Sequence, residues 1–186
     1  MRWLNGGATF ACESLTFFVN GDPRPPALDS KTLPMSTALI FRMGRYEAEF
    51  PTDRQYAWNH MWAQRRGDVI RFGFTAYAVR LLQAVYFLDW TVEPGVTLQR
   101  RQEIGSIESQ KAESALFAPI TGNLAALNEP LLDDPSTINA DKYGEGWLLE
   151  IRGTGDGLLT PEQYLEHLAE VWPEAQRKIK GQLSES

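Results

Sequence analysis

The sequence has few of the residues that build covalent cross-links or metal centres. It contains one cysteine, Cys12, and two histidines, His60 and His167, in 186 residues. One cysteine cannot form a disulfide within the chain and cannot build a cysteine-rich metal site. The two histidines lie far apart in the sequence, with no metal-ligand spacing around either, and both are interpreted as structural residues. We therefore expect no metal centre.

Long hydrophobic runs and an excess of positive charge are also missing. No apolar stretch approaches the roughly 20 residues of a membrane-spanning helix. Residues 1–12 lack the continuous apolar segment of a signal peptide, and residues 9–12 are a poor version of a lipid-attachment site. The formal net charge of −6 argues against nucleic acid as the main partner. We expect a cytoplasmic protein that works without a membrane or nucleic acid.

The composition is typical of a globular domain, because 43% of the residues are hydrophobic and 23% are charged. The length of 186 residues suits one domain with a core and some additional segments. Residues 1–50 are predicted to be a partly irregular N-terminal extension, since residues 20–26 combine turn and linker residues. Residues 51–155 are predicted to form the main domain, and residues 156–186 a C-terminal helix and tail packed on it.

Short runs of apolar and β-branched residues, separated by turn residues, fill the middle of the chain. This pattern predicts a mostly β fold, a small barrel or sandwich of antiparallel strands. Thr75 is the expected N-cap of a short helix that extends to Gln83. A helical turn is expected at residues 135–139. The expected strands cover residues 15–20, 38–43, 68–74, 85–90, 102–107, 115–120, 124–127 and 147–151.

The C-terminal segment has the pattern of an amphipathic helix. Residues 160–163 provide an N-cap threonine, a first-turn proline and a glutamine that closes a capping box. Apolar residues then recur at helical spacing, at Tyr164, Leu165, Leu168 and Val171. We predict a helix from Pro161 to Trp172 that packs its apolar face on the domain, followed by a loosely held polar tail from Pro173.

Lys111 lies between two of the predicted strands, residues 102–107 and 115–120. The chain must reverse between them, so Lys111 is expected at the tip of a β-hairpin. A lysine in this position is held out in water on a rigid support, which is the geometry needed for a covalently attached swinging cofactor. A solvated turn lysine without a function is the alternative if this residue is considered alone.

The segment around Lys111 is acidic. Between Glu103 and Glu145 the chain has eight acidic residues and only two basic ones, Lys111 and Lys142, so this segment alone accounts for the net charge of −6. Two interpretations are open. The acids form a solubilising surface, or they form a docking surface for basic rims on partner enzymes, which would raise encounter rates.

The residues around the lysine are similar to a known motif. Glu108-Ser109-Gln110-Lys111-Ala112 resembles the Glu-Ser-Val-Lys-Ala lipoylation site of the glycine cleavage system H proteins. Several separated motifs in the right order make the resemblance strong over residues 53–172, and they indicate a divergent, H-like member of the family. The further motifs lie at residues 60–62, 72–75, 118–122, 128–131, 134–139 and 143–147.

The resemblance implies a lipoyl-type barrel-sandwich hybrid with a C-terminal helix, and lipoic acid amide-linked to Lys111. It also implies that Ser109 and Ala112 belong to the attachment site. Glu108 and Gly122 match positions that the family uses for recognition by lipoylating enzymes. The implied protein is a non-catalytic carrier that shuttles an aminomethyl group from glycine decarboxylase to aminomethyltransferase, with dihydrolipoamide dehydrogenase reoxidising the arm. A tethered arm visits these partners at high effective concentration.

Three residues depart from the family pattern. Met61 replaces a glutamate, Ala115 replaces an aspartate, and Gln110 replaces a valine. The two family carboxylates line the recess that holds the loaded arm, so their loss is expected to weaken the hold on a cationic group by roughly 1–3 kcal/mol per contact. Met61 has a simpler interpretation as a core residue. Glu113 is not expected to compensate, because strand alternation places it on the opposite hairpin face from Ser114.

Two other functions remain open. The chain can be an H-like lipoate-binding protein of another pathway, such as sulfur oxidation or lipoyl relay between enzymes, and the missing carboxylates favour this. It can also be an interaction module that keeps the fold without lipoylation. An independent enzyme is not expected, because the sequence contains no recognisable catalytic nucleophile, metal cluster or phosphate-binding glycine loop.

Overall fold

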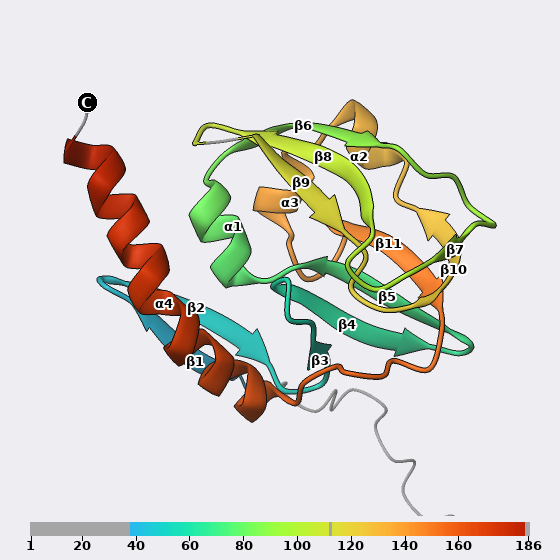
Figure 1. Ribbon diagram of the computed structural model, residues 1–186, viewed down its shortest axis with the longest axis horizontal. Helices are drawn as coiled ribbons and strands as arrows, with labels where there is room; N and C mark the ends of the chain where they lie inside the picture. Colours follow the sequence, from blue (N-terminus) through green and yellow to red (C-terminus); the bar gives the residue numbers. More distant parts are fainter. Residues whose placement is uncertain (1–37, 112, 185–186) are drawn as a thin grey trace, which may run out of the picture. The chain divides into compact units, whose positions relative to one another are not determined.

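The computed structural model describes residues 38–111 and 113–184 (Figure 1), all within one structural unit, Ser36–Ser186. None of the helices in these residues has the length and apolar composition of a membrane span. In chain order the elements are β1 (Ala38–Met43), β2 (Tyr46–Pro51), β3 (Gln55–Tyr56), β4 (Met61–Arg66), β5 (Val69–Phe74), α1 (Ala76–Leu82), β6 (Val85–Trp90), β7 (Thr97–Leu98), β8 (Glu103–Ser109), β9 (Glu113–Phe117), β10 (Gly122–Leu127), α2 (Pro130–Asp133), α3 (Thr137–Ala140), β11 (Trp147–Arg152) and α4 (Pro161–Ser184).

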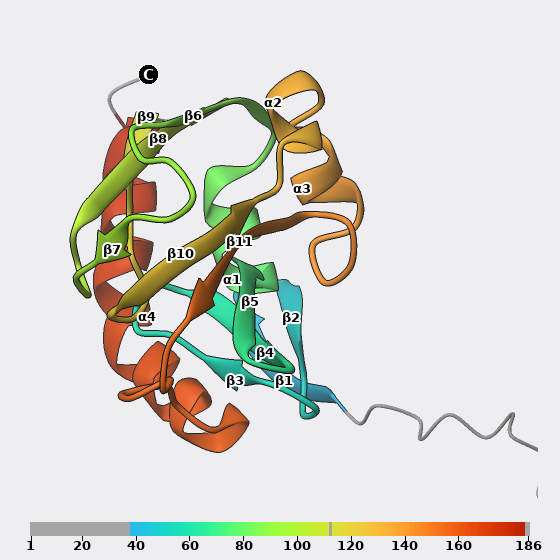
Figure 2. The same cartoon turned by 90° about the vertical axis from the view of Figure 1, so that its right-hand side faces the viewer.

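The strands form two facing sheets and a separate hairpin (Figure 2). The larger sheet has the order β3-β4-β5-β11-β10-β7, the smaller sheet has the order β6-β8-β9, and β1 pairs with β2. All of these pairings are antiparallel. This arrangement confirms the prediction of a mostly β fold built from short antiparallel strands.

One hydrophobic core fills the space between the two sheets. Phe72 and Leu149 come from the larger sheet, and Leu88, Ile107 and Leu116 come from the smaller one. All five side chains are removed from solvent. Burial of such a side chain stabilises the fold by roughly 1.5–3 kcal/mol, so this core holds the smaller sheet firmly against the larger.

A second cluster joins the β1–β2 hairpin to α1 and α4. The rings of Tyr56 and Tyr164 stack with their centroids 4.6 Å apart, and Phe50 packs edge-on against Tyr164 at 5.3 Å. Tyr164 and Leu168 of α4 are completely buried in this cluster. The predicted packing of the apolar helix face is therefore confirmed.

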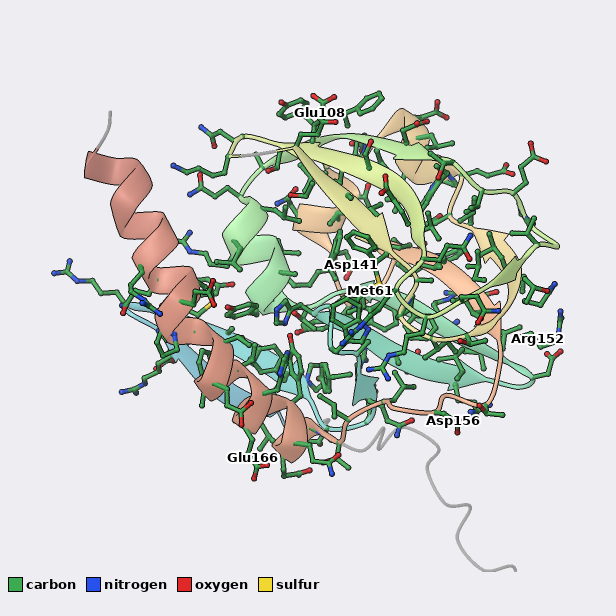
Figure 3. All side chains as sticks on the ribbon, in the orientation of Figure 1. Met61, Glu108, Asp141, Arg152, Asp156 and Glu166 are labelled. Carbon is green, nitrogen blue, oxygen red and sulfur yellow. The ribbon has the colours of Figure 1, made fainter. Side chains whose placement is uncertain are left out.

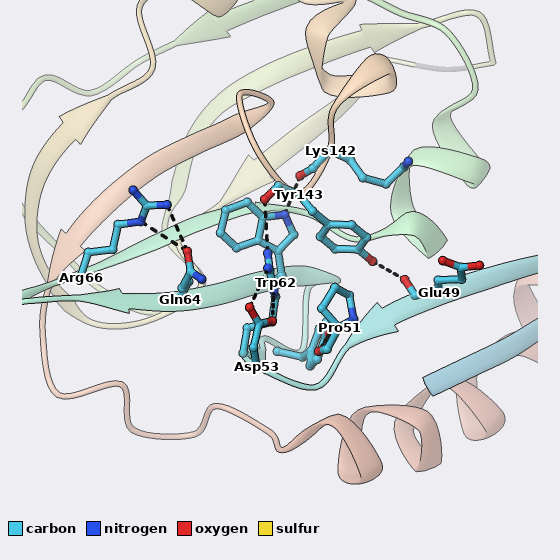
Figure 4. A network of polar contacts seen from close by, with 10 residues as sticks. Glu49, Pro51, Asp53, Trp62, Gln64, Arg66, Lys142 and Tyr143 are labelled. Atoms are coloured by element: carbon cyan, nitrogen blue, oxygen red, sulfur yellow. Dashed lines mark hydrogen bonds and ion pairs between the residues drawn. The ribbon is translucent and has the colours of Figure 1, made fainter. Parts of the chain in front are cut away.

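Polar contacts also fix the β1–β2 hairpin to its neighbours (Figure 4). The Tyr143 hydroxyl donates to the carbonyl of Glu49 in β2 at 2.6 Å and accepts from the backbone N–H of Ala76 in α1 at 3.1 Å. Burial raises the pKa of the Tyr143 phenol, so the hydroxyl keeps its proton and both bonds. The indole N–H of Trp62 in β4 donates to the carbonyl of Lys142 at 2.7 Å. The segment before β11 thereby links β2, β4 and α1.

Both predicted helix starts are confirmed. The Thr75 hydroxyl accepts from the backbone N–H of Ala78 at 3.3 Å and caps α1. At the start of α4, the Thr160 hydroxyl accepts from the N–H of Gln163 at 3.3 Å, and the Gln163 side chain accepts from the N–H of Thr160 at 2.9 Å. This reciprocal pair is the capping box expected from the sequence.

The predicted end of the C-terminal helix is wrong. Instead of ending at Trp172, α4 passes through Pro173 and continues to Ser184, so the polar segment is helical. Proline removes one backbone donor and disfavours a helix interior. However, the residues that follow, from Glu174 to Arg177, are mostly strong helix formers. One lost hydrogen bond does not end a helix whose next turn has high helix propensity.

The strands were predicted better where apolar residues dominate. The predictions for residues 38–43 and 85–90 match β1 and β6, whereas residues 15–20 lie outside the described part of the chain. The strand β2 was missed although Tyr46, Ala48 and Phe50 alternate with charged residues. The strand β4 was missed because three apolar residues are followed by three polar ones, which gives no alternation. The remaining predicted strands, at residues 68–74, 102–107, 115–120, 124–127 and 147–151, correspond to β5, β8, β9, β10 and β11 with bounds shifted by one to three residues.

The capping box allows a direct test of how α4 contributes to stability. Thr160→Ala is expected to lower the free energy of unfolding by about 1 kcal/mol, because an N-cap bond is lost. Urea denaturation followed by circular dichroism measures this change. Thr154→Ala is the matched control, since the bond of Thr154 to Arg65 uses only its backbone carbonyl. Equal stability of the two variants would contradict this role of Thr160.

Candidate functional site

Lys111 lies in the turn between β8 and β9, and its side chain is exposed. The two strands pair antiparallel up to the Glu108–Glu113 pair, so Gln110 and Lys111 fall in the reversal between them. The prediction of a lysine at a hairpin turn is confirmed. Ala112, the residue after the lysine, lies outside the described residues.

The base of this turn is anchored to the connection between α1 and β6. The N–H of Gln110 donates to the carbonyl of Ala84 at 2.9 Å. The same connection is tied to α3, because the side chain of Asn139 accepts from the N–H of Val85 at 3.0 Å and also donates to the carbonyl of Gln83. Asn139 thus positions the lysine turn through Ala84. The sequence offered one signal for this role, since Asn139 closes the motif at residues 134–139.

The other predicted site residues lie at different depths around the lysine. Glu108 is partly exposed near the end of β8, the central strand of the smaller sheet (Figure 3), and is paired in register with Phe87 of β6. Ser109 ends β8 and is only 4% exposed. Gly122 begins β10 in the larger sheet, where a Cβ atom would lie 2.5 Å from the carbonyl oxygen of Arg152. Close packing of β10 on β11 therefore requires a glycine at this position, away from the lysine turn.

A cavity of about 450 Å³ opens beside Lys111. Its walls are mostly apolar. They come from Phe74 in β5, Leu81 and Leu82 in α1, Ile107 in β8 and Ala175 in α4, and Ser109 also contributes. Within the described part of the chain, no acidic side chain lines this cavity.

The structure places two of the three residues that depart from the family pattern in different surroundings, Ala115 in the cavity lining and Met61 in the core. Ser114 and Ala115 line the cavity, whereas Glu113 is exposed and does not, so Glu113 does not replace the missing carboxylate. Strand alternation alone does not explain this, because Ala115 lies on the same face of β9 as Glu113 and still lines the cavity. Met61 is 1% exposed and belongs to the core between the sheets (Figure 3), so its interpretation as a core residue is confirmed. Only the substitution at Ala115 removes a carboxylate from the wall of this cavity.

His60 supplies a polar group to the cavity. Its Nδ1 lies 3.1 Å from the Tyr164 hydroxyl, which is also 3.1 Å from Oγ1 of Thr75. Burial, with a smaller contribution from His167, lowers the pKa of His60 to about 4. The imidazole is therefore neutral at pH 7 and does not add a positive charge to the cavity.

The two histidines interact, which their distance in the sequence did not indicate. The rings of His60 and His167 stack with centroids 5.5 Å apart. Nε2 of His167 lies 3.2 Å from the carbonyl oxygen of Trp58. The residues that the structure describes contain no group of three or more histidine, cysteine, aspartate or glutamate side chains placed to hold a metal ion. Packing and hydrogen bonding thus account for both histidines, in agreement with their structural interpretation.

The fold and the site together define a class of protein. An exposed lysine on an anchored hairpin turn, beside a mostly apolar cavity of a two-sheet β domain, is the arrangement expected of a carrier domain with a tethered prosthetic arm.

Comparisons with known proteins identify the family. The family model for the glycine cleavage H-protein matches residues 54–171. The chain is 40% identical over 124 residues to a probable glycine cleavage system H protein of Natronomonas pharaonis, covering 65% of this chain and 98% of that protein. The glycine cleavage system H protein of Rubrobacter xylanophilus is also 40% identical over 124 residues, covering 66% of this chain and 98% of that one.

A solved structure agrees with this result. The crystal structure of a glycine cleavage system H protein from Mycobacterium marinum is 35% identical and superposes with a TM-score of 0.57 over 65% of this chain and 98% of that one. The chain belongs to the glycine cleavage H-protein family, and its fold is the barrel-sandwich hybrid of that family. Strands β1 and β2 and the last turns of α4 lie outside the segment matched by the family model.

The low pKa of His60 gives the stability a defined pH dependence. The unfolded histidine binds a proton below about pH 6.5, whereas the folded one does so only near pH 4, so stability should fall as the pH drops between these values. We expect a loss of about 1–3 kcal/mol between pH 7 and pH 4.5 from this residue. His60→Asn is expected to remove this part of the loss, since asparagine tolerates the positive φ of residue 60.

Urea denaturation at a series of pH values measures the difference. His167→Asn is the matched control, and it should retain most of the pH dependence because burial of His60, the larger cause, is unchanged. Identical pH profiles for the wild type and His60→Asn would contradict this account.

Proposed function

We propose that this chain is the lipoyl carrier of a glycine cleavage system, with lipoic acid amide-linked to Nζ of Lys111. It shuttles an aminomethyl group between glycine decarboxylase and aminomethyltransferase. The observation that carries the proposal is the exposed Lys111 in the anchored turn of β8 and β9, in a chain that belongs to the H-protein family. The protein is a carrier component rather than an enzyme.

The residues around Lys111 fit a lipoyl group. The lysine is exposed to a modifying enzyme, and the cavity beside it offers apolar walls to an aliphatic chain and a dithiolane ring. The attached group would supply the redox and group-transfer chemistry. The chain's own residues hold the attachment point: Asn139 fixes the connection at Ala84, and Ala84 fixes the turn through Gln110.

The surroundings of the lysine suit recognition by partner enzymes. Seven of the eight acids between Glu103 and Glu145 are exposed, and Glu108 is partly exposed beside the turn. A lipoylating enzyme would attach the group to Lys111. It would recognise the lysine together with four further residues, Glu108, Ser109, Ala112 and Gly122. Dihydrolipoamide dehydrogenase and the two transfer enzymes would meet the same acidic surface, where complementary basic rims raise association rates.

A second candidate function is lipoate carriage in another pathway. It is favoured by Ala115, because the cavity wall has no carboxylate at the position where the family has an aspartate. A carrier with this cavity would hold a cationic group less tightly. Genes for heterodisulfide-reductase-like subunits beside the gene would favour this function, and genes for glycine cleavage enzymes would favour the first.

The carrier function is tested by the intact mass of the protein purified from its own host. We expect a lipoyl-sized addition, mapped to Lys111 by peptide analysis, in the wild type and in Lys142→Arg. Lys111→Arg should lack it. An unmodified Lys111 in cells whose other lipoyl proteins are modified would contradict both carrier functions and favour an interaction module. Glycine decarboxylase should load the lipoylated form; no loading, while a standard family H protein is loaded alongside, would exclude glycine cleavage.

The role of Ala115 gives a further test of how the cavity treats a cationic group. Ala115→Asp restores a carboxylate to the cavity wall. We expect spontaneous loss of an aminomethyl group from the loaded arm to slow about fivefold, the lower end for a charge-assisted contact because residue 115 is exposed. The release of ammonia without partner enzymes measures this rate. Ala115→Asn is the neutral control of equal size, and equal rates for the two variants would contradict the charge effect.

A further inference from the structure

Two segments of the described chain lie outside the family domain. The family match ends at residue 171, but α4 continues to Ser184. Likewise, β1 and β2 precede the match, which begins at residue 54. Relatives from Natronomonas pharaonis and Rubrobacter xylanophilus are 98% covered by an alignment to about two thirds of this chain. These segments lie outside the residues that the family model matches, and about a third of this chain lies outside the alignment to each of those relatives.

The two segments pack against each other. Trp172, the first residue of α4 beyond the match, meets the ring of Phe41 in β1 edge-on, with centroids 6.4 Å apart. Its ring also meets Tyr77 of α1 edge-on at 6.2 Å. The neighbouring strand β2 also contacts α1, because the guanidinium of Arg80 lies 4.9 Å from the ring centroid of Tyr46 in β2. Phe41 and Tyr77 also contact each other edge-on at 6.2 Å, so the β1–β2 hairpin and α1 together form one aromatic cluster that holds α4 at Trp172.

The supported end of α4 reaches the cavity beside the lysine. Both views show α4 passing the β1–β2 hairpin and extending beside α1 toward the tip of β8 and β9 (Figures 1 and 2). Ala175, three residues after Trp172, lines the same cavity as Lys111, Leu81, Leu82 and Ser114. One wall of the cavity is thus built by a residue that the family segment does not contain.

The chemistry of the cavity selects a neutral occupant. Its described lining has no acid that would stabilise a cation, and its walls are mostly aliphatic. The volume of about 450 Å³ lies within the range of small-molecule sites, roughly 300–1,000 Å³. A neutral aliphatic arm that ends in a dithiolane suits such a site, and Lys111 would attach it at the cavity opening.

We propose that the end of α4, supported by the β1–β2 hairpin, is a wall that retains the neutral lipoyl arm in this cavity between transfers. The proposal rests on the lipoylation of Lys111 proposed above. In this protein the arm is sheltered by its own carrier more than in relatives that lack both segments. Ala175 is a positioning residue in this arrangement, and Trp172 is the residue that holds α4 in place.

The test uses the full-length lipoylated protein, with lipoylation verified by intact mass. The rate of dithiolane reduction by a water-soluble phosphine measures the exposed fraction of the arm. We expect the wild-type arm to react about tenfold more slowly than free lipoamide, as it would if one tenth of the arms were exposed at any time. Ala175→Trp should fill the cavity and bring the rate close to that of free lipoamide.

Ala169→Trp is the matched control, because Ala169 is exposed on the same helix and does not line the cavity. It should keep the slow wild-type rate. Ala175→Met fills less volume and should give an intermediate rate, so the result does not depend on one bulky variant. Trp172→Ala should also raise the rate, and Trp172→Phe, which keeps an aromatic ring, should restore most of the shelter.

Two results would overturn the proposal: a wild-type arm as reactive as free lipoamide, or equal rates in Ala175→Trp and Ala169→Trp. If the mass shows no lipoyl group on Lys111, the proposed function fails, and the cavity is then tested alone with free lipoamide. Lipoamide titrated into the unmodified protein should shift the amide NMR signals of Ala175 and Leu81. Unchanged signals would contradict the proposal that the end of α4 forms a wall of a lipoyl-binding cavity, independently of lipoylation.

Discussion

The anchoring of the lysine turn at Ala84 is the contact on which the functional geometry depends. A two-stranded hairpin is only marginally stable by itself, and its tip moves freely unless something holds it. Here the bond from Gln110 to Ala84 joins the tip to the start of β6, and Asn139 of α3 holds that start from the other side. The lysine side chain is exposed, yet the residue before it is hydrogen-bonded to the main body of the fold at Ala84. A carrier needs this combination, because only the arm should move.

The same region separates charge from the cavity. The acids of the segment from Glu103 to Glu145 lie on the surface, whereas the described cavity lining has apolar walls, hydroxyl groups and a neutral His60. A charged group is costly to place in apolar surroundings, so the cavity favours a neutral arm and the surface favours basic partners. The cavity and the acidic surface therefore serve different contacts, the cavity with the neutral arm and the surface with basic partner enzymes.

The lysine hairpin, the capping box of α4 and most strands were predictable, because each has a local pattern in the sequence. Features that depend on contacts between distant segments were not. The continuation of α4 through Pro173 had a local signal in the helix-forming residues that follow, but the contact of Trp172 with Phe41 that holds this part of α4 in place had none. The stacking of His60 on His167 arises from the packing of α4 and has no sequence signature. Ala175 resembles any helical alanine until α4 is placed beside the cavity.

The pairing of Glu108 with Glu113 across the hairpin has a consequence for insertions and deletions. In a strand, a shift of one residue moves every side chain to the opposite face. One residue gained in the turn at Lys111, with β9 sliding by one residue along β8, would bring Glu113 to the position that Ser114 now occupies in the cavity lining. The number of residues in the turn therefore decides whether the cavity lining contains an acidic side chain. Among homologous chains, a length change at this turn would mark carriers adapted to a positively charged cargo.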